Sequence, residues 1–253
     1  MAKIFYYDSV GLSDLSSGSI MAGTHSGTTF SPSAGAVTNE HRIKDQSIGH
    51  GVSSFDAGDC IRIDFGGALS TASDFMLIYH ASADVDDLII YTASSATATG
   101  SGAFSDSSST AGWNLLSFGN SNRYLFIESS TGAFTGGLSE VIIGTKLTFE
   151  NEPDIGIATQ EMFATDINKS YGGVEYANKR HEPQSTWTLN FSNISQTFRN
   201  NLASMEADIT NYKKFVYYDD SAYHYVRLDA PIKFTEVAYQ RFSASLKLRE
   251  QLS

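Results

Sequence analysis

Thr186-Trp187-Thr188-Leu189-Asn190-Phe191 begins the stretch, ending at Leu228, that decides the fold of the C-terminal half. Large apolar and polar side chains alternate in it, as they do in a strand with one buried face. After Ser195, a candidate N-cap, apolar residues recur at helical spacing, at Phe198, Leu202, Met205 and Ile209. This spacing predicts a helix over about 195–209 whose apolar stripe lies on a sheet.

The sheet that covers this stripe is predicted from the residues that follow the helix. Two aromatic-rich runs, 214–218 and 223–228, flank Asp219-Asp220-Ser221-Ala222, a sequence that favours a turn. Period-2 patterns at 232–237 and 242–248 predict the last two strands. Residues 155–159 are expected to begin a strand, and a Gly-Gly turn is expected between two strand pieces within 169–176. We therefore expect 149–253 to form a β domain with one helix.

The first half has a different composition. Of the 21 glycines, 18 precede residue 150. After a Gly- and Ser-rich start, short apolar runs separated by turn residues predict strands at 61–65, 75–79, 88–91, 124–128 and 138–144. The segment 92–111 is rich in Ser, Thr, Ala and Gly, which favours a long loop. Many short strands without a helix predict an antiparallel β-sandwich over 1–148, followed by a polar linker near Pro153.

Charge and cysteine content exclude several classes of protein. The net charge of −11 divides into −8 before residue 150 and −3 from there on, so stable nucleic-acid binding is not expected. Cys60 is the only cysteine, which excludes an intrachain disulfide. No apolar run reaches the roughly 20 residues of a membrane span, and the short apolar N-terminus does not match a signal peptide. We expect a protein made and folded in a cytoplasm.

Four short pieces of the first half carry a resemblance: Cys60-Ile61-Arg62-Ile63-Asp64-Phe65-Gly66, Leu88-Ile89-Ile90-Tyr91, Arg123-Tyr124-Leu125-Phe126-Ile127 and Glu140-Val141-Ile142-Ile143-Gly144. Their succession over about 50–148 resembles the discoidin or galactose-binding-like jelly-roll family. The resemblance implies a two-sheet jelly roll. It does not imply a ligand, because such domains serve unrelated functions.

The second half resembles another family. The Trp187 strand, the helix, the hairpin that ends in Tyr225-Val226-Arg227-Leu228 and the terminal Ser245-Leu246-Lys247-Leu248 strand occur in an order similar to the tail-tube-like fold of minor and distal tail proteins of long-tailed bacteriophages. In that family copies, usually six, pair their sheet edges into a ring that joins the tail tube to the tip. The tube-like part is C-terminal here, opposite to the arrangement common in distal tail proteins. An acidic ring channel would let DNA pass without sticking.

Two groups of aromatic residues are candidates for binding. Trp113 could stack on a sugar, or it could pack under its own loop, as large aromatic side chains usually do. Tyr217, Tyr218, Tyr223 and Tyr225 lie on opposing hairpin strands, so some are expected to face away from the core. They could form a subunit interface, where tyrosine is enriched, or pair with one another across the hairpin.

Reactive chemistry finds no support in the sequence. Asp84, Asp86 and Asp87 could bind calcium, but a solvated turn fits better because the glycine and distal glutamate of an EF-hand are missing. Asp219 and Asp220 are expected in a turn rather than as an acid–base pair. The histidines have no zinc spacing, and neither a nucleophile elbow nor a P-loop occurs. Cys60 is expected to be a small buried residue. We expect no enzyme activity, no metal and no cofactor.

Three hypotheses follow. The first is a structural virion protein of a bacteriophage tail, a distal tail or baseplate hub adaptor that forms a homo-oligomeric ring, a hexamer in that family, and contacts tube, hub and fibre proteins. The alternative is a carbohydrate-binding adhesin module that recognises host-surface glycans through its N-terminal domain. The third is a noncatalytic domain pair from a larger enzyme system.

Overall fold

A computed structural model describes residues 3–251 except 34, 53–54, 70–72, 81–87, 99–103, 107–110, 117–118, 130–137, 155–157, 163–164, 172, 174, 180–181 and 211. The chain divides into two compact units. Residues Tyr6–Lys146 form the first, and Met1–Phe5 with Leu147–Leu252 form the second. The expectation of a mainly β protein is confirmed, because strands dominate the described part of both units.

The first unit contains strands β2 to β10 and three short 3-10 helices. Their bounds are η1 Leu12–Asp14, η2 Ser17–Ser19, β2 Ile20–Ser26, β3 Thr29–Pro32, η3 Glu40–Lys44, β4 Asp59–Asp64, β5 Phe75–His80, β6 Leu88–Ala93, β7 Phe104–Asp106, β8 Gly112–Leu116, β9 Tyr124–Ser129 and β10 Leu138–Gly144.

The second unit is built from the remaining elements. Their bounds are β1 Ile4–Tyr6, β11 Leu147–Thr148, β12 Ala158–Met162, β13 Thr165–Lys169, β14 Glu175–Lys179, β15 Gln184–Ser195, α1 Gln196–Ile209, β16 Phe215–Tyr218, β17 Tyr223–Leu228, β18 Lys233–Ala238 and β19 Arg241–Glu250.

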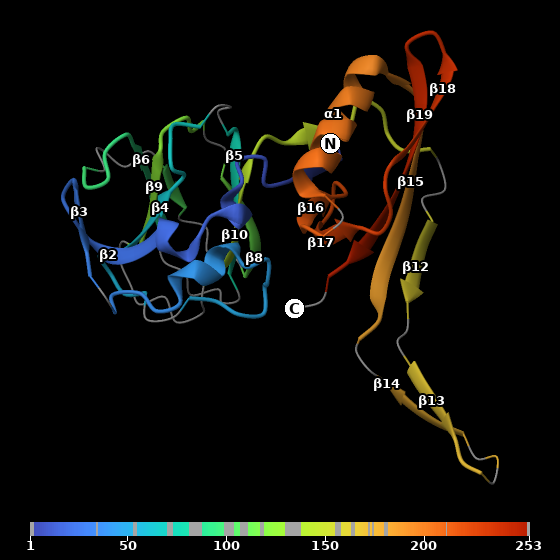
Figure 1. Cartoon of the computed structure of the whole chain (residues 1–253), viewed down its shortest axis with the longest axis horizontal. Helices are drawn as coiled ribbons and strands as arrows, with labels where there is room; N and C mark the ends of the chain where they lie inside the picture. The colour runs from blue at the N-terminus through green and yellow to red at the C-terminus, as the bar shows by residue number, and fades with distance from the viewer. Residues whose placement is uncertain are drawn as a thin grey trace. The chain divides into compact units, whose positions relative to one another are not determined.

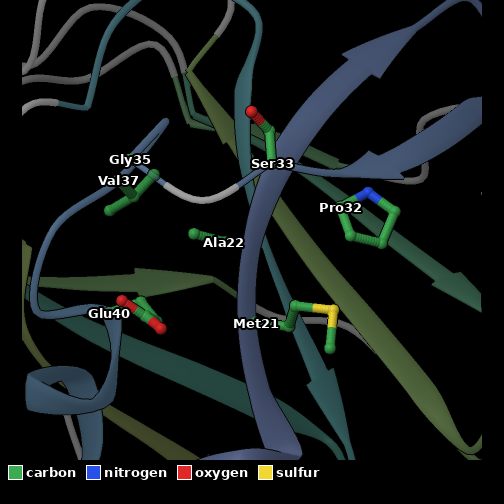
Figure 2. Close-up of a pocket in the computed structure, with 7 residues that line it drawn as sticks. All are labelled: Met21, Ala22, Pro32, Ser33, Gly35, Val37 and Glu40. Carbon is green, nitrogen blue, oxygen red and sulfur yellow. The ribbon is translucent and has the colours of Figure 1, made fainter.

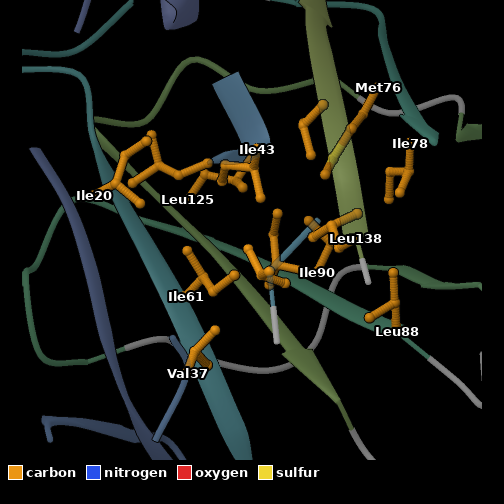
Figure 3. Packing of buried hydrophobic residues seen from close by; sticks show 14 of the residues in the cluster. Ile20, Val37, Ile43, Ile61, Met76, Ile78, Leu88, Ile90, Leu125 and Leu138 are labelled. Atoms are coloured by element: carbon orange, nitrogen blue, oxygen red, sulfur yellow. The ribbon is translucent and has the colours of Figure 1, made fainter. Parts of the chain in front are cut away.

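The first unit is a β-sandwich. Its described strands form one sheet in the order β3-β2-β4-β9-β6-β7 and another in the order β10-β5-β8. Because side chains alternate along each strand, one face of each sheet supplies a shared apolar core. Ile61, Leu125 and Ile90 of the larger sheet pack there with Ile78 and Leu138 of the smaller one (Figure 3).

A second apolar layer covers the opposite face of the larger sheet. Phe30, Tyr91, Tyr124 and Phe126 are buried in it together with Cys60. Arg62 places its guanidinium 5.3 Å from the centre of the Phe30 ring and 5.7 Å from that of Tyr124. Apolar side chains therefore occupy both faces of β4 and β9.

A bidentate ion pair joins two of the segments on which the resemblance to the galactose-binding-like family rests. Arg123 donates two hydrogen bonds to Asp64, from Nε to Oδ1 at 2.7 Å and from Nη2 to Oδ2 at 2.9 Å. The hydrogen bonds from Arg123 lower the pKa of the Asp64 carboxyl. Such bidentate contacts fix geometry as well as charge, so this pair helps to hold the register of β4 and β9.

The second unit is organised around a sheet in which the described strands follow the order β11-β1-β16-β17-β19-β15-β12, with β18 on β19 (Figure 1). Phe149 lies at its aromatic centre. Its ring is 4.7 Å from Phe5, 5.1 Å from Phe191 and 6.1 Å from Tyr217, measured between ring centroids. These contacts join the start of the chain to strands more than 140 residues away.

The predicted helix is confirmed. Helix α1 follows Ser195, and its buried residues are the four of the predicted stripe: Phe198, Leu202, Met205 and Ile209. The Ser195 hydroxyl accepts the Phe198 N–H at 3.1 Å and donates to Glu150 Oε2 at 2.6 Å. The stripe lies on β15 and β19, where Phe198 and Phe191 make an edge contact at 5.8 Å.

This cap gives a first prediction. Ser195→Ala removes the acceptor for the Phe198 N–H and is expected to lower the free energy of unfolding by about 1 kcal/mol. Urea denaturation measures the change. Ser195→Thr keeps a hydroxyl and is expected to retain most of the stability. Equal stability of Ser195→Ala and the unmodified chain would contradict the assigned cap.

Two expectations need correction. Strand β1 pairs with β11 through Ile4↔Thr148 and Phe5↔Leu147, so the first residues belong to the second unit and not to a domain spanning 1–148. The Gly- and Ser-rich start contains β2 and β3, and the expected loop 92–111 contains β7. These strands were missed because their apolar residues are sparse.

Candidate functional site

The longest strands of the second unit form a ribbon with two open edges. Strand β15 pairs with β19 from Thr186↔Arg249 to Ser195↔Arg241. Strand β12 lies on the other side of β15, and β18 lies on the far side of β19. We call β12-β15-β19-β18 the ribbon (Figure 1). All three pairings are antiparallel, so the two edge strands run in opposite directions.

Both edge strands of the ribbon are exposed on both faces. In β12, the side chains of 159–162 are all exposed, and in β18 only Phe234 is partly covered. Met162 and Val237 are exposed apolar residues on these edges, at 39% and 57%. Natural proteins avoid open apolar edges, because unpaired N–H and C=O groups attract other strands. These edges are therefore candidates for pairing with another chain.

Strands β13 and β14 form an arm that extends beyond the ribbon (Figure 1). Every residue of β14 is exposed, and the arm carries Ile167, Tyr171 and Tyr176 at 62%, 111% and 58% exposure. Ion pairs Lys169–Glu175 and Lys179–Glu182 lie on its surface. A two-stranded hairpin is at best marginally stable in water, so a partner that covers these apolar side chains would stabilise it.

The four hairpin tyrosines divide into two pairs. Tyr217 and Tyr225 are buried, Tyr217 beside Phe5 at 5.6 Å, so their expected role in a subunit interface is wrong. The cause is that both faces of this hairpin are covered, which its sequence pattern does not reveal. Tyr218 and Tyr223 are half-buried and their rings lie 4.8 Å apart across the strands. Cross-strand pairing is thus observed for these two, and a subunit contact stays a prediction.

Trp113 lies in strand β8 rather than in a polar loop. It is half-buried and makes an edge contact with Tyr79 at 5.2 Å. Pairing of Tyr79 with Trp113 and of Leu77 with Leu115 places these side chains on one face, opposite to the core residues Met76 and Ile78. Leu115 is 36% exposed. An aromatic pair with an apolar neighbour therefore forms an accessible surface.

Asp219 organises a turn, as expected. Its carboxylate accepts hydrogen bonds from the Ser221 hydroxyl at 2.7 Å and the Ala222 N–H at 2.8 Å, and His224 Nε2 lies 2.9 Å away. Partial burial favours the neutral carboxyl, but these hydrogen bonds outweigh it and lower the pKa of Asp219. Because Ser221 donates to the carboxylate and not to the imidazole, the group lacks the order of a nucleophile relay.

The outer layer of the sandwich contains a buried polar cluster that sequence patterns did not indicate. His25 Nδ1 lies 2.8 Å from Glu128 Oε2, and the Tyr91 hydroxyl donates to the same oxygen at 2.5 Å. Cys60 is buried nearby, and burial followed by the Glu128 charge raises the pKa of its thiol. The expectation that Cys60 is a small buried residue is confirmed, because its side chain is fully buried. Knowledge of the strand register would have predicted that these side chains share one face. It would not have predicted that they are buried.

A hollow of about 410 Å³ lies beside β2 in the first unit. Its lining consists of Met21, Ala22, Pro32, Ser33, Gly35, Val37 and Glu40 (Figure 2). Among the described residues of this lining, Glu40 is the only one with an ionisable side chain. A lone carboxylate without a basic partner gives the hollow no acid–base pair for catalysis.

Asp84, Asp86 and Asp87 lie outside the described residues. Within the described ranges, no group of three His, Cys, Asp or Glu side chains has the geometry of a metal site. In that same part of the chain, no helix is long and apolar enough to cross a membrane.

Comparison with known proteins gives little. The sequence matches no family model and no curated protein. A crystal structure of chitosan-binding module 1 from a chitosanase/glucanase of Paenibacillus sp. IK-5 is similar, at 17% identity and a TM-score of 0.37. The match covers 49% of this chain and 91% of the module. A likeness this distant assigns neither a ligand nor a function.

Proposed function

We propose that this protein is a structural component of a bacteriophage tail, a distal tail or baseplate hub adaptor that forms a ring between tail tube and tail tip. The observation that supports it most is the ribbon, with its two exposed edges of opposite direction. The resemblance over 150–253 suggests assembly into a ring of copies. The exposed edge strands of the ribbon could form such a ring by pairing with those of neighbouring copies.

Strand direction favours a cyclic arrangement. The two edges are staggered along the ribbon, because β12 pairs with residues 184–188 of β15, whereas β18 pairs with residues 241–245 of β19, which lie opposite 190–195 of β15. A rotation about an axis inclined to the strands, as in a barrel, can bring β12 of one copy against β18 of the next. Because these strands run in opposite directions within one copy, their contact is antiparallel, like every other pairing in the ribbon. A contact between two different surfaces gives a ring when the rotation closes. The main-chain hydrogen bonds of the new pair would satisfy both open edges.

The arm gives the ring a contact to its neighbours. Ile167, Tyr171 and Tyr176 are exposed on it, and tyrosine is enriched at the centres of protein interfaces. Exposed apolar side chains so far from a core are stabilised by a second protein surface. We assign the arm to contacts with further copies or with tube, hub and fibre proteins in the virion, after synthesis in the host cytoplasm.

The mass of the purified full-length protein tests the proposal. Light scattering should give a multiple of the 27.5 kDa chain mass, and negative-stain electron microscopy should show closed rings. Two results together would reject the proposal: a 27.5 kDa particle at every concentration of the purified protein, and the absence of a ring of this protein in tails purified from virions.

A second candidate is glycan binding, favoured by the accessible surface of Tyr79, Trp113 and Leu115. Aromatic faces can cover apolar sugar surfaces, and this pair is held by two adjacent strands. Under this candidate the full chain binds a glycan on an array, and Trp113→Ala weakens that binding at least tenfold. Tyr212→Ala, an exposed aromatic of the other unit, is the control and should bind normally. Absence of any bound glycan for the unmodified chain would remove the candidate.

A further inference from the structure

The two faces of the ribbon have different chemistry. Leu189, Leu246 and Leu248 are buried on the face that carries α1. The opposite face presents the alternate residues of β15 and β19, which are Thr186, Thr188, Asn190, Ser243, Ser245, Lys247 and Arg249. We call it the polar face. Hydroxyl, amide and cationic side chains dominate it, whereas Lys and Ser are depleted in protein–protein interfaces.

Cations gather on the polar face although the chain is acidic overall. Lys247 and Arg249 lie on β19. On the neighbouring strands, Lys233 of β18 pairs with Ser245 of β19, and Arg227 of β17 pairs with Arg249 of β19. Asp229 binds Arg249 at 2.6 Å. Among the described residues, no carboxylate lies within ion-pair distance of the Lys233 or Lys247 ammonium group. The carboxylates responsible for the net charge of −11 are thus mostly elsewhere.

The strand register places two cations of the polar face against each other. Arg227 and Arg249 are directly opposite each other on neighbouring strands. Like charges in such positions repel, and the ion pair with Asp229 compensates the charge of Arg249. An anionic ligand over this face would relieve the repulsion.

A small hollow marks where an anion could sit. It has a volume of about 110 Å³ and is lined by Ala230, Pro231, Lys233, Ser245 and Lys247. Ser245 donates its hydroxyl proton to Asn190 Oδ1 at 2.8 Å, so the two lysines are the charged donors of the hollow. A second hollow of about 160 Å³ shares Lys247 and adds Thr186, Thr188 and the Asp229 carboxylate, which is paired with Arg249. Lysine and hydroxyl side chains are typical partners of phosphate oxygens.

We propose that the polar face contacts the phosphodiester backbone of duplex DNA, with Lys233 and Lys247 on the phosphates. The assignment to DNA rests on the proposed ring, since a ring at the tail tip surrounds the path of the genome. It differs from the acidic channel that net charge suggested, because the charge of this face is set by a few positions of β18 and β19. Two lysines per copy give a weak, salt-sensitive contact, not stable binding.

Fluorescence anisotropy of a labelled duplex with the full-length protein tests the inference. Affinity is measured between 20 and 200 mM salt for the unmodified chain, Lys233→Ala/Lys247→Ala and the control Lys44→Ala/Lys146→Ala. Both double variants remove two lysines, but the control pair lies in the first unit and not on the ribbon or the arm. Polyglutamate serves as a competing anion, and light scattering of the same samples records assembly.

We expect Lys233→Ala/Lys247→Ala to weaken binding about tenfold at low salt and to reduce the slope of log affinity against log salt by about two. The control should stay within twofold of the unmodified chain. Equal losses in both double variants, no binding at 20 mM salt, or competition by polyglutamate as strong as by DNA would each overturn the inference. A ring that binds no DNA refutes this inference alone. A monomer that binds DNA through the two lysines refutes the ring and supports the polar face.

Discussion

Met162→Asp combined with Val237→Asp is expected to convert the assembled protein to a particle with the 27.5 kDa mass of one chain. One aspartate is placed on each open edge of the ribbon, at positions that are exposed within a copy. Edge pairing would bury these charges beside another strand, and burying an unpaired charge is costly. Exposed substitutions rarely change stability by more than about 0.5 kcal/mol, so the fold should survive.

The control is Tyr212→Asp, which places the same charge on an exposed aromatic position outside the two edges. It should leave the assembly intact. Light scattering reports mass and thermal unfolding reports the fold of all variants. Persistence of full-mass particles in the double aspartate variant would exclude β12 and β18 as the assembly edges.

Glu140→Gln is expected to stabilise the first unit at pH 8 by about 1–3 kcal/mol, the desolvation cost of a buried polar group, because the neutral amide removes a buried carboxylate charge. Glu140 is 3% exposed, and its Oε2 has no hydrogen-bond partner among the residues that the structure describes. Burial raises the pKa of this carboxyl well above 4.5, and the neighbouring Asp45 raises it further. The Gln46 and Ser47 N–H groups lower it, but by less.

The direction of the pH dependence follows from this shift. A carboxyl whose pKa is higher in the folded state binds more protons there than in the unfolded state. Its contribution to stability is therefore complete below about pH 4.5, the ordinary pKa, and declines as the pH rises toward the folded pKa. Glu140→Gln is neutral at every pH and should abolish this decline. The two proteins should differ little at pH 4 and most at pH 8.

Urea denaturation from pH 4 to pH 8 measures this difference. Glu40→Gln, at a partly exposed carboxylate of the same unit, is the control and should follow the unmodified chain. Parallel stability curves for Glu140→Gln and the unmodified chain would show that Glu140 is not a strained, buried acid.

Local pattern predicted the second unit well where each element has one covered face. The alternation at Trp187, Leu189 and Phe191 and the helical spacing from Phe198 to Ile209 agree with burial in the structure. Pattern failed where pairing is distant in sequence. Strand β1 is too short to be recognised, and its partner β11 lies more than 140 residues away.

The exposed edges and the polar face of the ribbon were harder to predict from the sequence than the elements themselves. Thr159, Gln160 and Glu161 do not show the pattern of a strand with one buried face, and their role as an edge follows only from pairing with β15. The hairpin tyrosines show the opposite error, because Tyr217 and Tyr225 looked available and are buried. Which polar residues share a face with Lys247 also required the register of β15, β18 and β19.

Crosslinking between two singly substituted chains tests the edge-to-edge ring most directly. Met162→Cys places a thiol on β12 and Val237→Cys places one on β18, while the native Cys60 is buried. A short bismaleimide should give covalent dimers when the two chains are assembled together, and not in either chain alone. Only monomers in the mixture, or equal dimers in each single-variant sample, would contradict the pairing of β12 with β18 of the next copy.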